Sequence, residues 1–149
     1  MSSAPAEMSD PGGSYLEVEA ATSDAEFHVH NLGVEEIFFT ARNQYLLDLG
    51  MDDLWHQQVV PQLRELLTLF ESEIAQGTFL QCRTTVVSRS RRAFVMEQAL
   101  RFSETSEVAA TCRSVHVTVN ESGAVDIPEA LWVAIEGQAG RTIPWVTRG

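Results

Sequence analysis

The amino-acid sequence predicts an α+β protein in which an antiparallel sheet wraps around one long central helix. Three observations lead to this prediction. A helical apolar pattern fills residues 32–50, three alternating segments follow between residues 78 and 119, and short polar turns join those segments. A helix followed by hairpin-linked strands favours an antiparallel sheet.

The N-terminal half provides one weak strand and one strong helix. Residues 1–14 are rich in Ser, Ala, Pro and Gly, which predicts a disordered tail, and residues 15–21 alternate as a modest strand does. After a polar loop, apolar residues recur at three- and four-residue steps up to Gly50. They are Val34, Ile37, Phe38, Ala41, Tyr45 and Leu49, and Phe39, Leu46 and Leu47 widen the stripe. We therefore expect a helix that is buried against the sheet.

The C-terminal half predicts the sheet. Residues 52–58 are typical of one or two helical turns or of a lid, and residues 63–74 fit either a helix or a strand. Gln76-Gly77 predicts a turn, and strands follow over residues 78–88, 93–102 and 108–119. Pro128 is well placed to begin a helix over residues 129–135. We expect one domain over residues 15–137 and a C-terminal tail over 138–149.

Composition limits the class of protein. The chain has 149 residues, the usual size of one domain, and it has neither an apolar run of membrane-spanning length nor a signal pattern. We expect a soluble, cytoplasmic protein that does not bind a membrane. Cys82 and Cys112 predict two buried, reduced thiols, although a disulfide between them is possible. The net charge of -11 argues against nucleic-acid binding, which needs a basic surface.

All ten basic residues are arginines, so a lysine Schiff base is excluded. Six of the ten lie between residues 83 and 113: Arg83, Arg89, Arg91, Arg92, Arg101 and Arg113. Because guanidinium groups bind phosphate through a planar bidentate fork, this cluster could hold a small phosphate-bearing ligand.

The polar loop before the long helix is the best candidate for chemistry. Asp24 could be a base or simply a turn carboxylate, and Asn31 is a preferred helix N-cap. His28 and His30 could bind a metal, but no third ligand has suitable spacing, so we predict no metal and no cofactor. The acidic pair that opens the helix, Glu35 and Glu36, complements the helix dipole or replaces Asp24 as the catalytic carboxylate. Glu65 and Glu71 are weaker candidates.

The same stretch resembles the hotdog-fold thioesterases, in particular the 4-hydroxybenzoyl-CoA thioesterase group of acyl-CoA and acyl-carrier-protein hydrolases. The group carries D-x-D-x-x-G-H-V-N-N, then F-E-x-A-R, then L-x-x-L-G. The matching residues are Asp24, His28, Val29, Asn31, Phe38, Ala41, Arg42, Leu46, Leu49 and Gly50. A weaker likeness continues through Gly77, the turn at Arg89 to Arg92, and Ile127-Pro128-Glu129, so that residues 15–136 are covered. The sequence departs from the motif at Thr22, Phe27, His30 and Val34.

The resemblance implies a hotdog fold, a site and an activity. It implies that Asp24 acts as general base or nucleophile and that the backbone N–H of Asn31 is an oxyanion donor. We also expect His28 and His30 of the same loop to contact the substrate, with histidines that are satisfied within the loop as the alternative. The turn residues Arg89, Ser90, Arg91 and Arg92 either contact the carrier phosphates or form a solvated hairpin.

We therefore expect hydrolysis of an acyl-CoA or acyl-carrier-protein thioester by a homodimer or homotetramer. The alternative is a hotdog domain that binds acyl thioesters, or assists assembly, without hydrolysis. The loss of the motif glycine and of the frequent aromatic, which Phe27 and Val34 replace here, favours that alternative. Dehydration of a hydroxyacyl thioester lacks its expected His/Asp signature.

Overall fold

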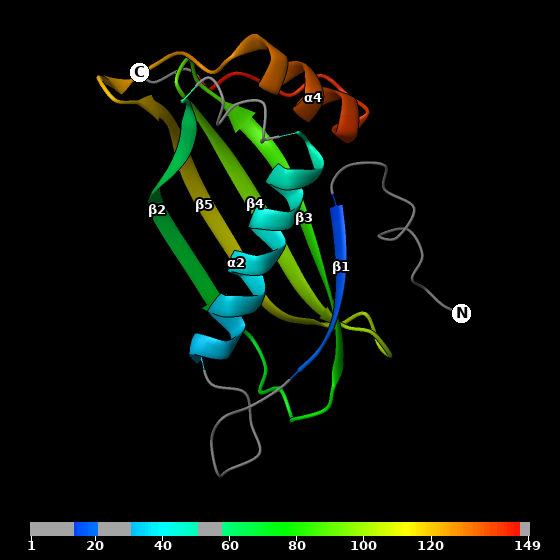
Figure 1. The fold of residues 1–149 in the computed structure, drawn as a ribbon. Helices are drawn as coiled ribbons and strands as arrows, with labels where there is room; N and C mark the ends of the chain where they lie inside the picture. Colours follow the sequence, from blue (N-terminus) through cyan, green and yellow to red (C-terminus); the bar gives the residue numbers. More distant parts are fainter. Residues whose placement is uncertain (1–13, 21–30, 51–57, 147–149) are drawn as a thin grey trace.

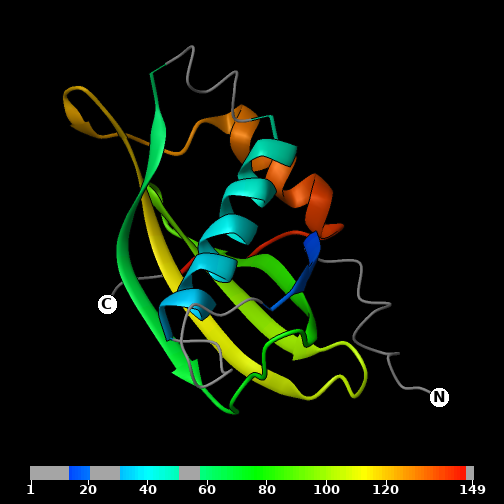
Figure 2. The same ribbon diagram turned by 60° about the horizontal axis from the view of Figure 1, so that its bottom comes forward.

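The computed structural model describes residues 14–20, 31–50 and 58–146. Its elements in chain order are β1 (Ser14–Glu19), α2 (Asn31–Asp48), β2 (Val60–Phe70), β3 (Phe79–Arg89), β4 (Ala93–Phe102), β5 (Val108–Asn120), β6 (Gly123–Ala124) and α4 (Glu129–Ala139). The strands form one sheet in the order β1-β3-β4-β5-β2, with β6 beside β5, and every pairing is antiparallel. The sheet curves around α2, as the sequence predicts (Figures 1 and 2).

The three consecutive strands β3, β4 and β5 confirm the predicted meander. Residues 63–70 of the ambiguous segment belong to a strand, β2, which pairs with β5 from Val60↔Val119 to Phe70↔Ala110, whereas residues 71–74 lie beyond it. Leucine and glutamate give this segment helical propensity, but pairing with β5 overrides it. The free side of β2 is an edge of the sheet, and most of its residues are exposed.

Helix α2 packs its predicted face on the sheet and leaves its other face open. Its N-terminal half, through Val34 and Phe38, packs with Leu80 and Leu100. Its C-terminal half packs through Tyr45 in a second cluster that includes residues of α4. The opposite face carries three exposed apolar side chains, Leu32, Phe39 and Leu47. Phe39 and Leu47, which the sequence analysis includes in the buried apolar stripe, are therefore exposed in the single chain.

Residues 138–146, at the start of the segment predicted as a C-terminal tail, pack on the domain. Helix α4 continues through Ala139, and Gly140 ends it with a φ of 69°. Ile143 is then buried at 1% exposure. Beyond it, Arg89 N–H donates to Pro144 O at 3.1 Å and Val146 N–H donates to Arg89 O at 2.6 Å. Among the described residues, β1 pairs with β3 as far as Thr84, and the bridge between Arg89 and Trp145 lies beyond that pairing.

Residues 52–57, for which the sequence predicts helical turns or a lid, lie outside the described residues. Neither helix in the described ranges has the length and hydrophobicity that a membrane span requires.

Candidate active site

The N-terminus of α2 is the part of the predicted site that the structure describes. Asn31 is the first helical residue and is exposed. The first amides of a helix have no intrahelical acceptor and lie at the positive end of its dipole, so they can bind an anion. Asp24, His28 and His30 lie outside the described residues, as do the departures Thr22 and Phe27. Val34, another departure, is a core residue at 3% exposure.

Beneath α2, a buried polar network connects the helix to the middle of the sheet. The Gln98 amide donates to Phe38 O and to Thr84 Oγ1, both at 3.0 Å. Its Oε1 accepts a hydrogen bond of 3.1 Å from Arg42 Nη1, which also lies 3.6 Å from Cys112 Sγ. Gln98 and Arg42 are 3% and 6% exposed. The Arg42 of the helix motif therefore holds α2 on the sheet and is not open to solvent.

The two cysteines are free and buried, as predicted. Cys82 lies on β3 and Cys112 on β5, with β4 between them, so they are about 10 Å apart, which is beyond disulfide reach. Burial raises the pKa of Cys82 to about 12 and also raises the pKa of Cys112. These thiols are structural side chains and not nucleophiles.

A serine–histidine pair on β5 was not singled out from the sequence. Ser114 Oγ and His116 Nε2 are 2.9 Å apart, and the imidazole stacks on Phe94 with a centroid distance of 5.2 Å. Burial, with a smaller effect of Arg42, lowers the pKa of His116 to about 4. Both residues are buried in the core, so no substrate reaches them there. Along β5, Ser114, His116 and Thr118 alternate with Val115, Val117 and Val119, and it is the polar set that is buried, so the apolar alternation carries no signal for this pair.

The alternative carboxylates differ in their surroundings. Glu35 is partly buried, and its Oε1 is buried without a hydrogen-bond partner among the described residues. Glu36, Glu65 and Glu71 are exposed. Glu35 is also the one of the four that is four residues from Asn31 on the same helix, so it is the strongest of these alternatives.

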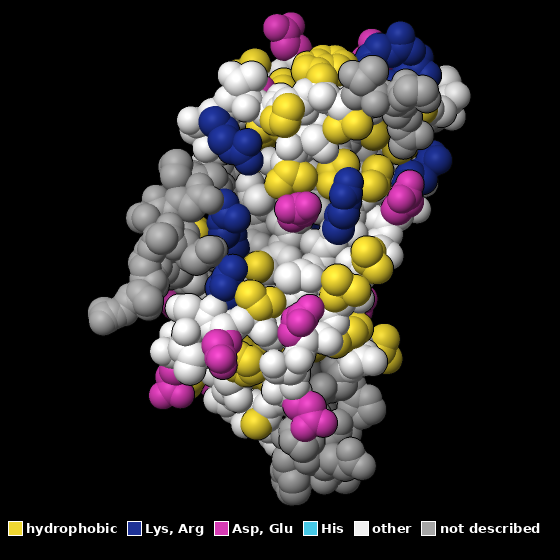
Figure 3. Space-filling model, turned by 180° about the vertical axis from the view of Figure 1, so that it is seen from behind, with side chains coloured by type: hydrophobic (Ala, Val, Ile, Leu, Met, Phe, Trp, Pro, Cys, Tyr) yellow, Lys and Arg dark blue, Asp and Glu magenta, His cyan; other side chains and the backbone are white. Residues whose placement is uncertain are grey.

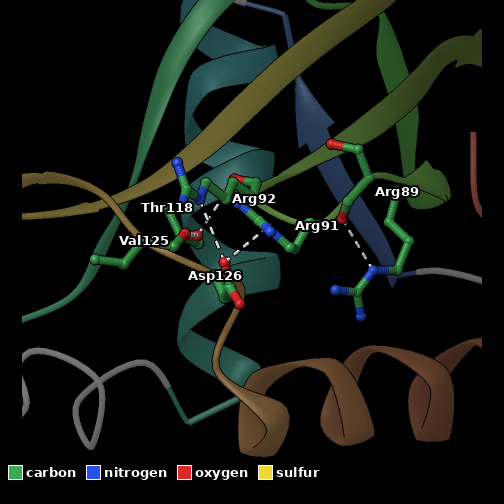
Figure 4. Close-up of polar contacts among 7 residues, drawn as sticks. Arg89, Arg91, Arg92, Thr118, Val125 and Asp126 are labelled. Atoms are coloured by element: carbon green, nitrogen blue, oxygen red, sulfur yellow. Dashed lines mark hydrogen bonds and ion pairs between the residues drawn. The ribbon is translucent and has the colours of Figure 1, made fainter. Parts of the chain in front are cut away.

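The arginine turn divides into a buried and an exposed part. Arg89 ends β3 and is 8% exposed, and its guanidinium lies between the rings of Trp132 and Trp145, with centroid distances of 4.4 and 4.0 Å. The sequence had placed it in the polar turn. Arg91 and Arg92 are exposed, and their Nε atoms lie 3.1 and 3.3 Å from Asp126 Oδ1 (Figure 4).

The backbone of this turn is fixed to the rest of the sheet. Ser90 N–H donates to Ala93 O at 2.7 Å, and Ser90 O accepts a bond from Arg89 Nε at 3.1 Å. Arg92 O accepts a bond of 2.9 Å from Thr118 N–H. Arg91 and Arg92 therefore extend two guanidinium groups from a turn whose backbone is held by hydrogen bonds. Among the described residues, Asp126 is the one carboxylate that pairs with both of them.

The arginine turn and Asn31 lie at opposite ends of α2 (Figure 1). The core packs Tyr45, near the C-terminal end of the helix, with Phe94 beside the turn. An 18-residue helix is about 27 Å long. The structure therefore does not bring the two predicted parts of the site together within one chain.

The outer face of the sheet, opposite α2, has a hollow of about 350 Å³. Glu97 and Arg113 are cross-strand neighbours there, with Leu67 and Leu69 of β2 at one side. Figure 3 shows arginines and carboxylates among hydrophobic side chains on this face. Within the described ranges, no three His, Cys, Asp or Glu side chains gather as a metal site would require.

Comparison with known proteins gives a family and a fold. The model of the thioesterase-like superfamily matches residues 18–135. Comparison with curated protein sequences finds no match.

Several solved structures are similar. A 1,4-dihydroxy-2-naphthoyl-CoA thioesterase from Synechocystis has a TM-score of 0.74 and 16% identity, with 83% of this chain and 96% of that chain covered. A thioesterase from Thermus thermophilus, complexed with coenzyme A and zinc, has a TM-score of 0.76 and 21% identity, with 89% and 97% covered. A hypothetical protein from Staphylococcus aureus in complex with CoA has a TM-score of 0.79 and 15% identity, with 91% and 88% covered. These likenesses confirm the predicted hotdog fold.

Proposed function

Because the chain belongs to the thioesterase-like superfamily, we propose that it hydrolyses an acyl thioester to a free acid and a thiol. The observation that carries the proposal is the exposed N-terminus of α2, and the segment that contains Asp24 directly precedes it in the sequence. Thioester hydrolysis needs a base or nucleophile and also donors directed at the developing oxyanion. Asp24 would supply the first function, and the backbone N–H of Asn31 the second. His28 and His30 of the same loop would contact the substrate.

We also propose that two subunits complete the site. The edge strand β2 exposes apolar side chains on the side that faces α2, among them Leu66 and Phe70, at 44% and 45% exposure. A long apolar edge strand favours pairing with another chain. Antiparallel pairing of two β2 strands about a two-fold axis runs the subunits in opposite directions, so the partner's arginine turn comes to the same end of the dimer as Asn31. A tetramer would need a second surface, and the hollow outer face of the sheet is available for it.

Coenzyme A is the carrier that the charges favour. Arg91 and Arg92 are exposed and suit phosphate groups. An acidic carrier protein would meet a chain of net charge -11, which disfavours its approach. Two similar structures are described as complexes with coenzyme A. We propose a cytoplasmic location because Cys82 and Cys112 are free, as is usual in a reducing compartment.

The test is thiol release from a panel of aromatic and straight-chain acyl-CoAs by the native protein and by Asp24→Asn. We expect kcat to fall by at least about 10²-fold, the lower end for loss of a general base. Asp48→Asn is the matched control, because it changes an exposed carboxylate at the other end of α2.

Undiminished activity in Asp24→Asn would move the chemistry elsewhere. Glu35→Gln, compared with its exposed neighbour in Glu36→Gln, would then test the most buried alternative. Acyl-CoA binding by the native protein without thiol release would instead establish the non-hydrolytic domain.

A further inference from the structure

We propose that Trp145 is a stacking platform for the adenine of the acyl-CoA substrate and thereby selects coenzyme A over a carrier protein. The inference rests on the proposed function and adds a nucleotide subsite to it. A carrier protein presents the phosphopantetheine arm without adenine, so only coenzyme A would use this residue.

Trp145 is a large aromatic residue that the fold leaves largely open. It is 60% exposed, whereas Trp132, the other ring against Arg89, is 8% exposed. The guanidinium of Arg89 lies 4.0 Å from the ring centroid of Trp145 and so occupies one face of it. Contact with Arg89 requires only that face, and much of the remaining indole surface is open to solvent.

The ring is held in place before any ligand arrives. The residues on either side of Trp145 form backbone hydrogen bonds with Arg89, through Pro144 O at 3.1 Å and Val146 N–H at 2.6 Å. Upstream, Ile143 is buried, and its N–H donates to Glu136 Oε2 at 2.9 Å. A preorganised aromatic surface loses little conformational entropy when a base stacks on it.

The platform is connected to the arginine pair through Arg89 and the turn that follows it. Arg89, which supports Trp145, is followed after Ser90 by Arg91 and Arg92, which Asp126 holds by their Nε atoms (Figure 4). The nucleotide part of coenzyme A consists of a base and of phosphate groups. An exposed aromatic ring suits the first and guanidinium groups suit the second. Trp145 lies beyond residues 18–135, so it is outside the region that the family model matches.

The experiment compares an acyl-CoA with the same acyl group on pantetheine, which lacks the nucleotide. We expect Trp145→Ala to raise KM for the acyl-CoA by about 5- to 150-fold, the range for loss of one base–aromatic stack, with kcat unchanged. KM for the acyl-pantetheine should not change, and Trp145→Phe should restore most of the loss. Val133→Ala is the control, because it truncates another exposed apolar side chain, on α4.

An equal rise in KM for both substrates would overturn the inference, because it would show general damage to the fold. No rise for either substrate would overturn it as well. A second readout does not need hydrolysis: adenosine 3′,5′-bisphosphate should quench tryptophan fluorescence in the native protein and not in Trp145→Phe. Quenching without any thioester hydrolysis would refute the proposed function alone. Hydrolysis without quenching would refute the adenine site alone.

Discussion

The buried amide of Gln98 gives the most direct test of how α2 is held on the sheet. Replacing it in Gln98→Leu keeps the approximate side-chain volume but removes the acceptor of Arg42 Nη1 and two donated bonds. Phe38 O can keep its helical bond and the Thr84 hydroxyl can rotate, so those losses are small. Arg42 keeps only the weak acceptor Cys112 Sγ, at 3.6 Å, for this nitrogen.

A buried donor that loses its acceptor costs about 1–3 kcal/mol, and more when the donor is charged, as Arg42 is. We therefore expect Gln98→Leu to lower the free energy of unfolding by about 3 kcal/mol. For a chain of this size, that corresponds to a fall in Tm of about 6–12 °C. The control Gln81→Leu, on the outer face of β3, should have little effect.

The assay is urea unfolding at one fixed protein concentration, followed by circular dichroism and tryptophan fluorescence. Removing both partners, in Gln98→Leu with Arg42→Met, should cost less than the sum of the two single changes, because no charge remains buried without its acceptor. A loss below about 1 kcal/mol in Gln98→Leu, or strictly additive effects in the double variant, would show that this network does not hold α2.

Two further predictions concern pH and assembly. Burial lowers the pKa of His116 from 6.5 to about 4, so between these values the unfolded chain binds a proton that the native protein excludes. The contribution of His116 to stability should be constant above pH 6.5 and fall by about 3 kcal/mol as the pH decreases to 4, and urea unfolding of His116→Gln should lack this component. Leu66→Lys should convert the proposed dimer to monomer in light scattering and abolish activity with it, whereas Val133→Lys, also at an exposed apolar position, should do neither. A dimeric Leu66→Lys protein would place the interface elsewhere.

The sequence predicts the central helix and the meander because their signals are local. Helix α2 has a 3.6-residue apolar period and ends next to Gly50, which has a φ of 88°. Strands β3, β4 and β5 alternate because one side of each faces the core, and Gly77, with a φ of 86°, makes the turn before β3. Each of these patterns arises because one face of the element is buried, and α2 and the sheet bury these faces against each other within the same chain.

Strand β2 and the C-terminal segment lack such local signals. Most of β2 is exposed on both faces, so its apolar residues do not alternate, and only its pairing with β5 makes it a strand. The position of residues 143–146 depends on backbone contacts with Arg89 at the end of β3, which is more than 50 residues away in the sequence. The segment from residue 138 onward has no periodic apolar pattern of its own, and for that reason the sequence predicts a tail there.

The candidate site shows the same division. The motif led to Asn31 and Arg42, and the structure places the first at the helix start and the second in the core. The partner of Arg42 could not be predicted, because Gln98 reaches it through the register that aligns Gln98 with Thr84 and Cys112. The roles of Asp24, His28 and His30 stay predictions.

The packing of Ile143 has a consequence for synthesis of the protein. Ile143 belongs to the same buried cluster as Tyr45 and Phe94, so this core lacks a member until residues 143–146 have left the ribosome. Chains emerge from the N-terminal end, so the pairing that fixes the end of β3 forms only after the whole meander has emerged. Until residues 143–146 follow, α2 and the meander have an incomplete core, and chaperones that shield apolar surface would act on the nascent chain during that interval.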